Sequence, residues 1–394
     1  MLDSTLANYV LLPELKFLRM WKERPGYTRI DCQKEPKTEF CPRCASPSNA
    51  AHDHRWVKAV DAPIRGYQVS LWIRKRRLYC RPCKKLFSEP IPGIQKKKRF
   101  TERFERSLRW ACENFTDLKA VRRQYRVSSG YLYQAYYRQL ELRRKSKAIE
   151  WPALVGIDEH SFRRNRHLGC TEFASIIVNL QKRKVMELVD GKGTADLEHQ
   201  LAYIPGRENV RFVTLDMCDP FKNFVRNFFP YAEVVADKFH VLRLLSPHLL
   251  RHRKEITGNR ADLRAKRLLL MSSHKLDYFS RLRLRQYLER YPTMAELYSW
   301  KERLHGFYRI RGYERAKVAL QHMLDAMARS ELKEIKTLRK TLLKWRNEIL
   351  NYFRTRLTNA MVEGFNNKAK LVKRRAYGYR SFANYRLRLL DACS

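Results

Sequence analysis

Leu154-Val155-Gly156-Ile157-Asp158-Glu159-His160 is the stretch that decides the fold of this chain. Its four leading apolar residues have the length and composition of a buried β-strand, and they end at a carboxylate. Two further apolar runs, Phe173 to Val178 and Val185 to Val189, have the same texture. The sequence therefore predicts three strands that meander at the start of a sheet.

Two more strands are predicted further along, at Arg211 to Leu215 and Ala232 to Ala236, and they end at Asp216 and Asp237. A helix is expected between the third and fourth strands, from Ala195 to Tyr203. A meander followed by strands that alternate with helices indicates a mixed α/β sheet.

Acidic residues directly after buried strands point to a metal site. A carboxylate at that place lies at the carboxyl edge of the sheet, and we expect Asp158 and Asp216 to lie on neighbouring strands. Two carboxylates held close together repel unless a divalent ion lies between them. Paired Mg²⁺ ions stabilise the attacking and leaving oxygens of a phosphoryl transfer. For either aspartate alone, a helix N-cap or a surface turn is the better explanation.

A third carboxylate lies on a helix predicted from Thr358 to Lys370. Its buried stripe is expected to contain Val362, Phe365, Ala369 and Val372, and its polar stripe Glu363, Asn366, Asn367 and Lys370. A glutamate beside the buried edge of such a helix can lean over the edge of a sheet. The alternative is a solvated Glu363 in the first turn, which the helix dipole favours.

The chain between His240 and Asn351 lacks the apolar runs that are typical of strands. Leu, Arg and Lys recur there at helical spacing, which predicts an all-helical insertion between the second and third carboxylates. Four aromatic side chains in this region are expected to pack between helices more often than to stack on exposed bases: Trp300, Phe307, Tyr308 and Trp345.

The charge balance points to a polyanionic partner. The 394 residues include 82 Lys and Arg against 40 Asp and Glu, a formal net charge of +42. Each phosphate that a cation neutralises releases a condensed counterion, so such a chain favours nucleic acid. No stretch of about 18 uncharged apolar residues predicts a membrane span. The first residues lack the pattern of a signal peptide, so a cytoplasmic protein with reduced thiols is expected.

Four of the nine cysteines form two pairs with two residues between them, Cys41 and Cys44, then Cys80 and Cys83. Such pairs let four thiolates reach one tetrahedral ion, so the sequence predicts a zinc ribbon. His52 and His54 lie between the pairs and could replace a cysteine as an alternative.

A helix-turn-helix is predicted after the ribbon. One helix begins near Thr101, a second runs from Asp117 to Tyr125, and a third contains Tyr131 to Tyr137 after a turn with a serine N-cap. Three cations make DNA the expected ligand: Arg122, Arg123 and Arg126. A plain three-helix packing unit is the alternative.

Four blocks of the chain are similar to the signature blocks of a known family. The first three are Asp158-Glu159-His160-Ser161, then Asp216-Met217 with Phe229-Pro230, then Asp237-Lys238-Phe239-His240. The fourth consists of Thr358-Asn359, Glu363-Gly364-Phe365-Asn366 and Lys373-Arg374-Arg375-Ala376-Tyr377-Gly378-Tyr379. They resemble the signature blocks of ISL3-type insertion-sequence transposases of bacteria. The resemblance implies an RNase H-like DDE domain in which Asp158, Asp216 and Glu363 are catalytic and bind magnesium. It gives Asp237 and His240 a supporting role.

The resemblance also implies an organisation. Residues 1–95 would hold the zinc ribbon, 96–150 the helix-turn-helix, 151–245 and 351–394 the two parts of the RNase H-like core, and 246–350 the all-helical insertion.

The expected activity is Mg²⁺-dependent cleavage and strand transfer of DNA, with two ions that Mn²⁺ can replace. The expected partners are double-stranded DNA, at transposon ends and target, and a second copy of the chain. Lys373, Arg374 and Arg375 are further DNA-binding candidates, and the protein would be associated with the bacterial nucleoid. The alternatives are a DNA-binding regulator that has lost activity and a structure-selective nuclease.

Overall fold

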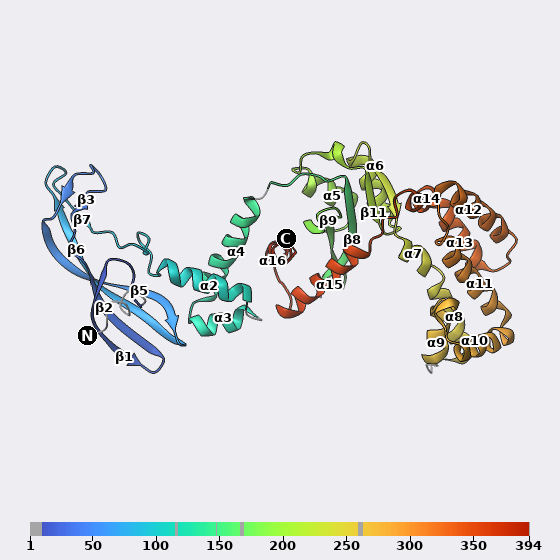
Figure 1. Cartoon of the computed structure of the whole chain (residues 1–394), viewed down its shortest axis with the longest axis horizontal. Coiled ribbons are helices and arrows are strands. Elements are labelled where there is room, and N and C mark those ends of the chain that lie inside the picture. The colour runs from blue at the N-terminus through green and yellow to red at the C-terminus, as the bar shows by residue number, and fades with distance from the viewer. Residues whose placement is uncertain (1–9, 115–116, 147, 166–168, 259–262, 394) are drawn as a thin grey trace. The chain divides into compact units, whose positions relative to one another are not determined.

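The computed structural model describes residues 10–114, 117–146, 148–165, 169–258 and 263–393. The chain divides into two compact units, residues 1–143 and 144–394, which are coloured from blue to red along the sequence in Figure 1. Within the described residues, no helix is both long and apolar enough to cross a membrane.

The first unit is built on a sheet of five strands in which β7 pairs with β6 and the others follow the order β1-β2-β6-β5. Strands β2 and β6 are parallel, and the remaining pairs are antiparallel. Val69, Leu71 and Ile73 on β6 are buried in the core of this unit. The strands are β1 (Leu15–Arg24), β2 (Tyr27–Lys34), β5 (Ala51–Ile64), β6 (Tyr67–Cys80) and β7 (Lys85–Ser88), with a small hairpin of β3 (Glu39–Phe40) and β4 (Pro47–Ser48).

Three helices complete the first unit: α2 (Glu102–Asn114), α3 (Leu118–Tyr125) and α4 (Ser129–Lys145). Helix α3 begins where the Asp117 carboxylate accepts a hydrogen bond from the backbone N–H of Ala120, and it ends at Arg126, whose φ is 52°. The Ser128 hydroxyl accepts from the backbone N–H of Tyr131 and starts α4. The sequence predicted these three helices, although α4 begins two residues earlier than Tyr131.

The second unit contains the mixed sheet that the sequence predicted, in the strand order β10-β9-β8-β11-β12. Strands β8, β9 and β10 are antiparallel neighbours, whereas β11 and β12 run parallel to β8. The strands are β8 (Leu154–Arg164), β9 (Thr171–Asn179), β10 (Lys184–Asp190), β11 (Phe212–Leu215) and β12 (Glu233–Ala236). β8 continues past Asp158, where the expected strand stopped, because its more polar second half still pairs with β9.

Helices cover both faces of this sheet. α5 (Thr194–Leu201) and α6 (Asp219–Phe228) pack on one face, and α15 (Ala360–Arg375) and α16 (Phe382–Ala392) pack on the other. Successive side chains of a strand point to opposite faces. Ile177 accordingly belongs to the apolar core on the face covered by α5 and α6. Ile176 and Val178 belong to the core on the face covered by α15 and α16. Figure 1 shows α15 alongside β8, far as the two are in sequence.

Between β12 and α15 the described residues form helices joined by short connections and contain no strand, as predicted. Trp300, Phe307, Tyr308 and Trp345 are all buried there, which confirms that they pack between helices. The helices are α7 (Lys238–Arg243), α8 (Ser246–Thr257), α9 (Leu263–Leu270), α10 (Tyr278–Arg290), α11 (Pro292–Phe307), α12 (Tyr313–Ala328), α13 (Lys333–Lys344) and α14 (Arg346–Thr355), with a short 3₁₀ turn at Ser273–Lys275. A further 3₁₀ turn, Arg207–Asn209, precedes β11.

Candidate active site and metal centres

Three aspartates form a row at the carboxyl edge of the second sheet. Gly156 on β8 pairs with Thr214 on β11, and Leu215 on β11 pairs with Ala236 on β12. Continued at the same offsets, these registers place Asp158 beside Asp216 and Asp216 beside Asp237. The parallel strands therefore hold the three carboxylates at one level.

Asp158 and Asp216 interact electrostatically. Burial raises the pKa of Asp158 to about 7, and the neighbouring negative charge of Asp216 adds to this rise. Two carboxylates at adjacent positions are unfavourable when both are ionised and no positive charge lies between them. The pair thus has the character of a site for a cation.

His240 supplies a positive charge at this edge. Its Nδ1 lies 2.9 Å from Asp216 Oδ1 and 3.3 Å from Asp237 Oδ2. Hydrogen bonds with Asp216, and then with Asp237, raise the pKa of His240 to about 10, so the ring is an imidazolium at neutral pH. A ring nitrogen of His240 and one carboxylate oxygen each of Asp216 and Asp237 lie within 4.8 Å of one another, so the ring could be a third metal ligand only after it loses its proton.

Asp237 is itself fixed from two sides. Burial alone would raise its pKa, but hydrogen bonds from His240 and from the backbone of Asn359 outweigh burial and hold the pKa below its ordinary value. Asp237 also caps α7, because its carboxylate accepts from the backbone N–H of His240. It therefore acts as an anchor for α7 as well as a member of the row.

Asn359, at the start of α15, ties the three strands to this helix. Its side-chain N–H donates to the carbonyl of Ile157 at 3.1 Å and to Asp216 Oδ1 at 3.5 Å. Its Oδ1 accepts from the Thr214 hydroxyl at 3.0 Å, and its backbone N–H donates to Asp237 Oδ1 at 3.0 Å. These contacts occupy the side chain, which makes no hydrogen bond that caps its own helix.

Gly156 lets α15 approach β8 closely. A Cβ at this position would lie 2.5 Å from Cγ2 of Val362, which is fully buried. Real Cβ atoms do not approach other atoms so closely, so a larger residue would force the helix or the strand to move. The glycine therefore sets the distance from which α15 side chains reach the aspartates.

Asn366 reaches the other end of the aspartate row. Its Nδ2 donates to Asp158 Oδ2 at 2.7 Å, and its Oδ1 lies 2.9 Å from Nδ1 of His160. The remaining ring nitrogen of His160 lies 2.7 Å from the hydroxyl of Tyr385 on α16. Of the four residues expected on the polar stripe of this helix, Asn366 is the one that these contacts bury.

The protonation of this chain of residues follows from its contacts. Burial lowers the pKa of His160 to about 4, so its ring is neutral and has one N–H. Because the Asn366 amide nitrogen faces Asp158, its oxygen must accept from His160 Nδ1–H, and His160 Nε2 must accept from Tyr385. In this series of hydrogen bonds, Tyr385 donates to His160, His160 to Asn366 and Asn366 to Asp158. All three donors therefore point towards Asp158, which favours its ionised carboxylate.

Glu363 on α15 is exposed and lies between two asparagines, four residues after the N-cap residue Asn359 and three before Asn366. Residues at these spacings share one face of a helix. Both neighbours on that face contact aspartates of the row. Among the described residues, its carboxylate does not join the close group formed by Asp216, Asp237 and His240.

The four paired cysteines meet in the first unit. The sulfur atoms of Cys41 and Cys83 lie 4.0 Å apart, those of Cys44 and Cys80 lie 3.5 Å apart, and all four are within 4.8 Å of one another. All four are free thiols. In the part of the chain that the structure describes, the two histidines between the pairs are not members of this group. Such a set matches the ligands of a closed structural zinc site.

Comparison with known proteins identifies the family. The model of the ISL3-type DDE transposases, described as "Transposase", matches residues 155–389, more than half of the chain. The chain belongs to the ISL3 transposase family. A second family model, the zinc finger of the transposases of IS204, IS1001, IS1096 and IS1165, matches residues 37–83. A curated relative is the transposase for insertion sequence element IS1001 of Bordetella parapertussis, 24% identical over 386 residues that cover 94% of this chain and 93% of the relative.

The basic candidates of this ISL3-family chain lie in two places. On α3, Arg122 donates to the Ser129 hydroxyl at 3.0 Å and thereby links α3 to α4, whereas Arg123 and Arg126 are exposed. At the end of α15, Lys373 donates to the backbone carbonyl of Ser161. The two residues after it, Arg374 and Arg375, are exposed.

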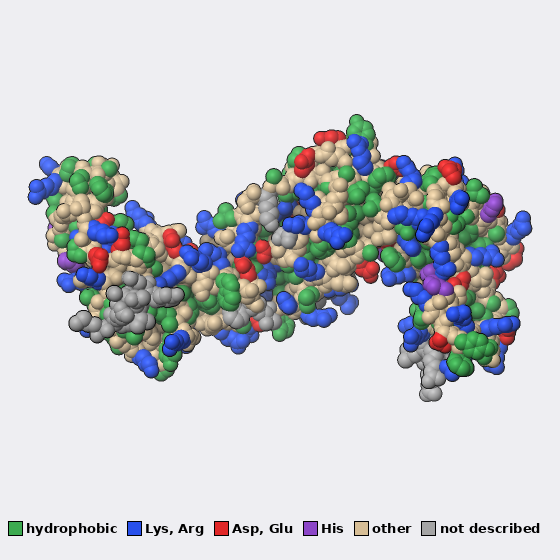
Figure 2. Space-filling view, viewed as in Figure 1, with side chains coloured by type: hydrophobic (Ala, Val, Ile, Leu, Met, Phe, Trp, Pro, Cys, Tyr) green, Lys and Arg blue, Asp and Glu red, His purple; other side chains and the backbone are tan. Residues whose placement is uncertain are grey.

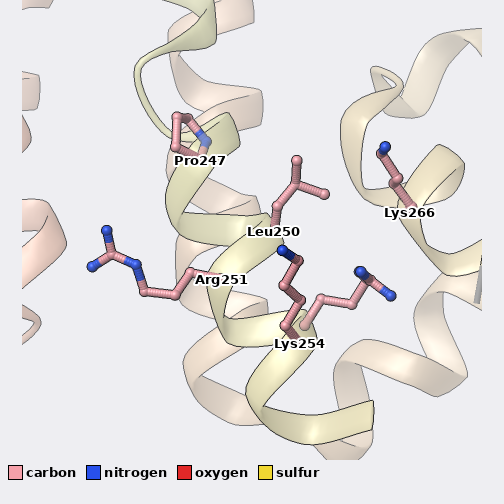
Figure 3. Close-up of a pocket in the computed structure, with 6 residues that line it drawn as sticks. Pro247, Leu250, Arg251, Lys254 and Lys266 are labelled. Carbon is pink, nitrogen blue, oxygen red and sulfur yellow. The ribbon is translucent and has the colours of Figure 1, made fainter. Parts of the chain in front are cut away.

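Lys and Arg side chains are spread over the face of the molecule shown in Figure 2. A cavity of about 350 Å³ in the helical region of the ISL3 domain concentrates them further (Figure 3). Four of its six lining residues are cations and none is acidic: Pro247, Leu250, Arg251, Arg253, Lys254 and Lys266. This surface suits an anionic ligand.

Proposed function

We propose that this protein is a DNA transposase that binds terminal inverted repeats and catalyses metal-dependent strand cleavage and strand transfer of an insertion sequence. The row of Asp158, Asp216 and Asp237, crossed by α15, is the single observation that carries the proposal. Membership of the transposase family agrees with it.

The strand order supports an RNase H-like core. Three antiparallel strands followed by two strands parallel to the first, with helices on both faces, form the framework, and the helical region enters it between β12 and α15. The three helices α2 to α4, with a turn between the last two, support a helix-turn-helix within residues 96–150.

The residues at the row fit divalent metal ions. We assign Asp158, Asp216 and Glu363 as the ligands of Mg²⁺, because oxygen ligands from carboxylates suit this hard cation. Asp237 and His240 support the site, since the imidazolium already neutralises charge between two of the carboxylates. The four cysteines would hold a structural Zn²⁺.

The protein's own residues would position the reacting groups and would not themselves react. When bound, two divalent ions would supply an activated oxygen nucleophile and stabilise charge on the transferred phosphate. Asn359 and Asn366 hold the aspartates in place from α15, so the carboxylates need little reorganisation. The mechanism calls for no nucleophilic side chain.

Recognition of DNA is assigned to the basic surfaces. Arg122 and Arg123 lie in the last turn of α3 and Arg126 directly after it, before α4, the helix that would enter the major groove. Lys373, Arg374 and Arg375 continue α15 away from the aspartates and would contact the phosphates of the DNA being cut. Two ends must be held together for transfer, so the active form is a dimer or larger assembly on DNA, in the bacterial cytoplasm.

Cleavage of labelled end DNA tests the proposal. The full chain is incubated with a duplex that carries the end of its own insertion sequence, in Mg²⁺, in Mn²⁺ or in EDTA. We expect metal-dependent cutting at the boundary of the element, lost in Asp158→Asn, Asp216→Asn and Glu363→Gln.

Two other results would replace the proposal. Tight binding of the end without cutting in either metal would favour a regulator that retains the scaffold. Cutting that ignores the end sequence would favour a structure-selective nuclease. The three variants must bind the end DNA as wild type does, because only then does lost cutting report on chemistry.

A further inference from the structure

A second cavity, of about 630 Å³, lies in the first unit between the sheet and the turn that precedes α4. Its volume falls in the range of about 300–1,000 Å³ that is usual for ligand pockets. Buried residues of β6 line it, among them Gln68 and Ser70, and exposed cations line it as well: Arg24, Lys58 and Arg126. The cavity therefore combines a polar buried wall with a positively charged one.

Two guanidinium groups share one aromatic ring in this cavity. The guanidinium carbon of Arg24 lies 3.8 Å from the centre of the Tyr27 ring, and that of Arg126 lies 4.2 Å from it. Stacking on the ring restrains both side chains and leaves the N–H groups at their edges available. The two like charges therefore lie within about 8 Å of each other, a separation at which they repel.

The cations of this cavity have no carboxylate partner in the described part of the chain. Among the described residues, neither Arg24, Lys58 nor Arg126 forms an ion pair, although the exposed Glu23 also lines the cavity. The hydrogen bond from Arg126 lowers the pKa of the Tyr27 hydroxyl, as expected in a positive potential. An anion is the ligand that such a surface lacks.

A buried hydroxyl also lacks a partner. The side chain of Ser70 is only 7% exposed, and within the described part of the chain its Oγ has no hydrogen-bond partner. Buried polar atoms are nearly always hydrogen-bonded, so an orphan in a cavity wall indicates a missing ligand. The start of α4 also borders the cavity, through Ser128, and the positive end of a helix dipole favours an anion.

We propose that this cavity is a phosphate-binding pocket that holds one backbone phosphate of DNA beside the start of α4. Arg24 and Arg126, held by Tyr27, would bind the phosphate oxygens, with Lys58 adding charge and Ser70 donating its hydroxyl. The assignment rests on the proposed DNA-binding function of this unit. It adds a residue of the sheet, Arg24, to a contact otherwise left to the helices, and so fixes the orientation of α4 on the duplex.

The test measures binding of the full chain to a labelled end duplex over a range of salt concentrations. Arg24→Gln should weaken binding about tenfold, since it removes a charge-assisted hydrogen bond. It should also lower the slope of log affinity against log salt by about 0.9, the value for one lost phosphate contact. The matched control is Arg55→Gln, an exposed arginine on β5 outside the cavity, and it should leave the slope unchanged.

Variants of Tyr27 show whether the positions of the two guanidinium groups, and not only their charge, contribute to DNA binding. Tyr27→Leu should weaken binding because the guanidinium groups lose the ring that restrains them, whereas Tyr27→Phe keeps the ring and should weaken binding less. Equal slopes for Arg24→Gln and Arg55→Gln would overturn the proposal, even where the wild-type chain binds and cuts DNA as proposed above.

A second arm uses inorganic phosphate alone and follows its binding to the full chain by calorimetry. Wild type should bind weakly at millimolar concentration and Arg24→Gln should not. This arm does not depend on cutting, so it stands if the transposase assignment fails. Phosphate binding that is lost in Arg24→Gln, together with an unchanged DNA slope, would assign the pocket to the free ion and overturn the DNA assignment.

Discussion

Asn366 donates its side-chain N–H to Asp158 at 2.7 Å, across 208 positions of sequence. The carboxylate on β8 is therefore oriented by helix α15, which returns to the sheet after the whole helical region. The other oxygen of Asp158 accepts from the backbone N–H of Glu159 at 2.8 Å. Both oxygens are thus held before any metal binds, and this arrangement leads to the predictions below.

Removing the amide should impair catalysis more than DNA binding. We expect Asn366→Ala to lower the cleavage rate roughly 10- to 100-fold, the usual effect of losing a residue that orients a metal ligand. The Mg²⁺ concentration for half-maximal rate should rise, because Asp158 becomes less well positioned. Asn367→Ala, the exposed neighbour on the same helix, is the matched control. Equal rates for the two variants would refute the positioning role.

Removing the Tyr385 hydroxyl should disturb the same chain from its far end. Tyr385→Phe leaves the buried Nε2 of His160 without its donor, at a cost of about 1–3 kcal/mol in the free energy of unfolding. Its effect on the cleavage rate should be smaller than that of Asn366→Ala. Thermal unfolding and single-turnover cleavage measure the two effects, and Tyr377→Phe, 89% exposed, serves as the control. A Tyr385→Phe protein that matches this control in stability would contradict the prediction.

Enlarging Gly156 should push α15 away from the sheet. Gly156→Ala brings a Cβ to 2.5 Å from Val362, and we expect a loss of about 1–3 kcal/mol in stability together with slower cleavage. The double variant Gly156→Ala, Val362→Ala should recover part of both losses. Gly364→Ala is a control on the same helix, since a Cβ there meets nothing within 4 Å. Additive losses in the double variant would show that the contact is not the cause.

Acid should weaken the second unit through Glu187, which is 2% exposed. Burial alone would raise its pKa, but the hydrogen bonds and charge of Arg386 outweigh burial and hold it below the ordinary value. The carboxylate therefore stabilises the fold fully above about pH 4.5, its ordinary pKa, and this stabilisation is lost as the pH falls through the lowered value. Arg386 lies on α16 next to Tyr385. The ion pair between Glu187 and Arg386 therefore also holds Tyr385, the first residue of the hydrogen-bonded series that leads to Asp158.

Glu187→Gln should accordingly cost about 3 kcal/mol at neutral pH, because it leaves the partly buried guanidinium groups of Arg386 and Arg144 without their charge partner. The loss should shrink as the pH falls below 4.5. Urea unfolding at a series of pH values measures it, with the exposed Glu208→Gln as the control. A loss that is constant with pH would show that the charge of Glu187 is not responsible.

The sequence was sufficient to predict features whose pattern lies within a single helix, strand or turn. Apolar runs of four to six residues predicted the strands of the second sheet, and the acids after them predicted its carboxyl edge. Two cysteine pairs predicted the group of four sulfurs, because each pair is a local turn. The long helices between β12 and α15 followed from their spacing of leucines.

The sequence was insufficient where the environment of a residue comes from a distant segment. Asn366 was predicted only as part of a polar stripe, and its contacts with Asp158 and His160 depend on the return of α15 to β8. Its spacing of seven residues from Asn359 was the one available signal, since that spacing puts both amides on one helix face. Strands β1 and β2 were also not predicted, and with them the contact between Tyr27 and Arg126.

The central claim is that Glu363 completes a metal site with Asp158 and Asp216, and the most direct measurement is the rate of 3′-OH formation at the element boundary in saturating Mg²⁺. Glu363→Gln is compared with Glu314→Gln, an exposed glutamate in the first turn of α12. We predict that Glu363→Gln binds the end DNA normally and forms no detectable 3′-OH, while Glu314→Gln matches wild type. A Glu363→Gln protein that cuts at the wild-type rate would contradict the assignment.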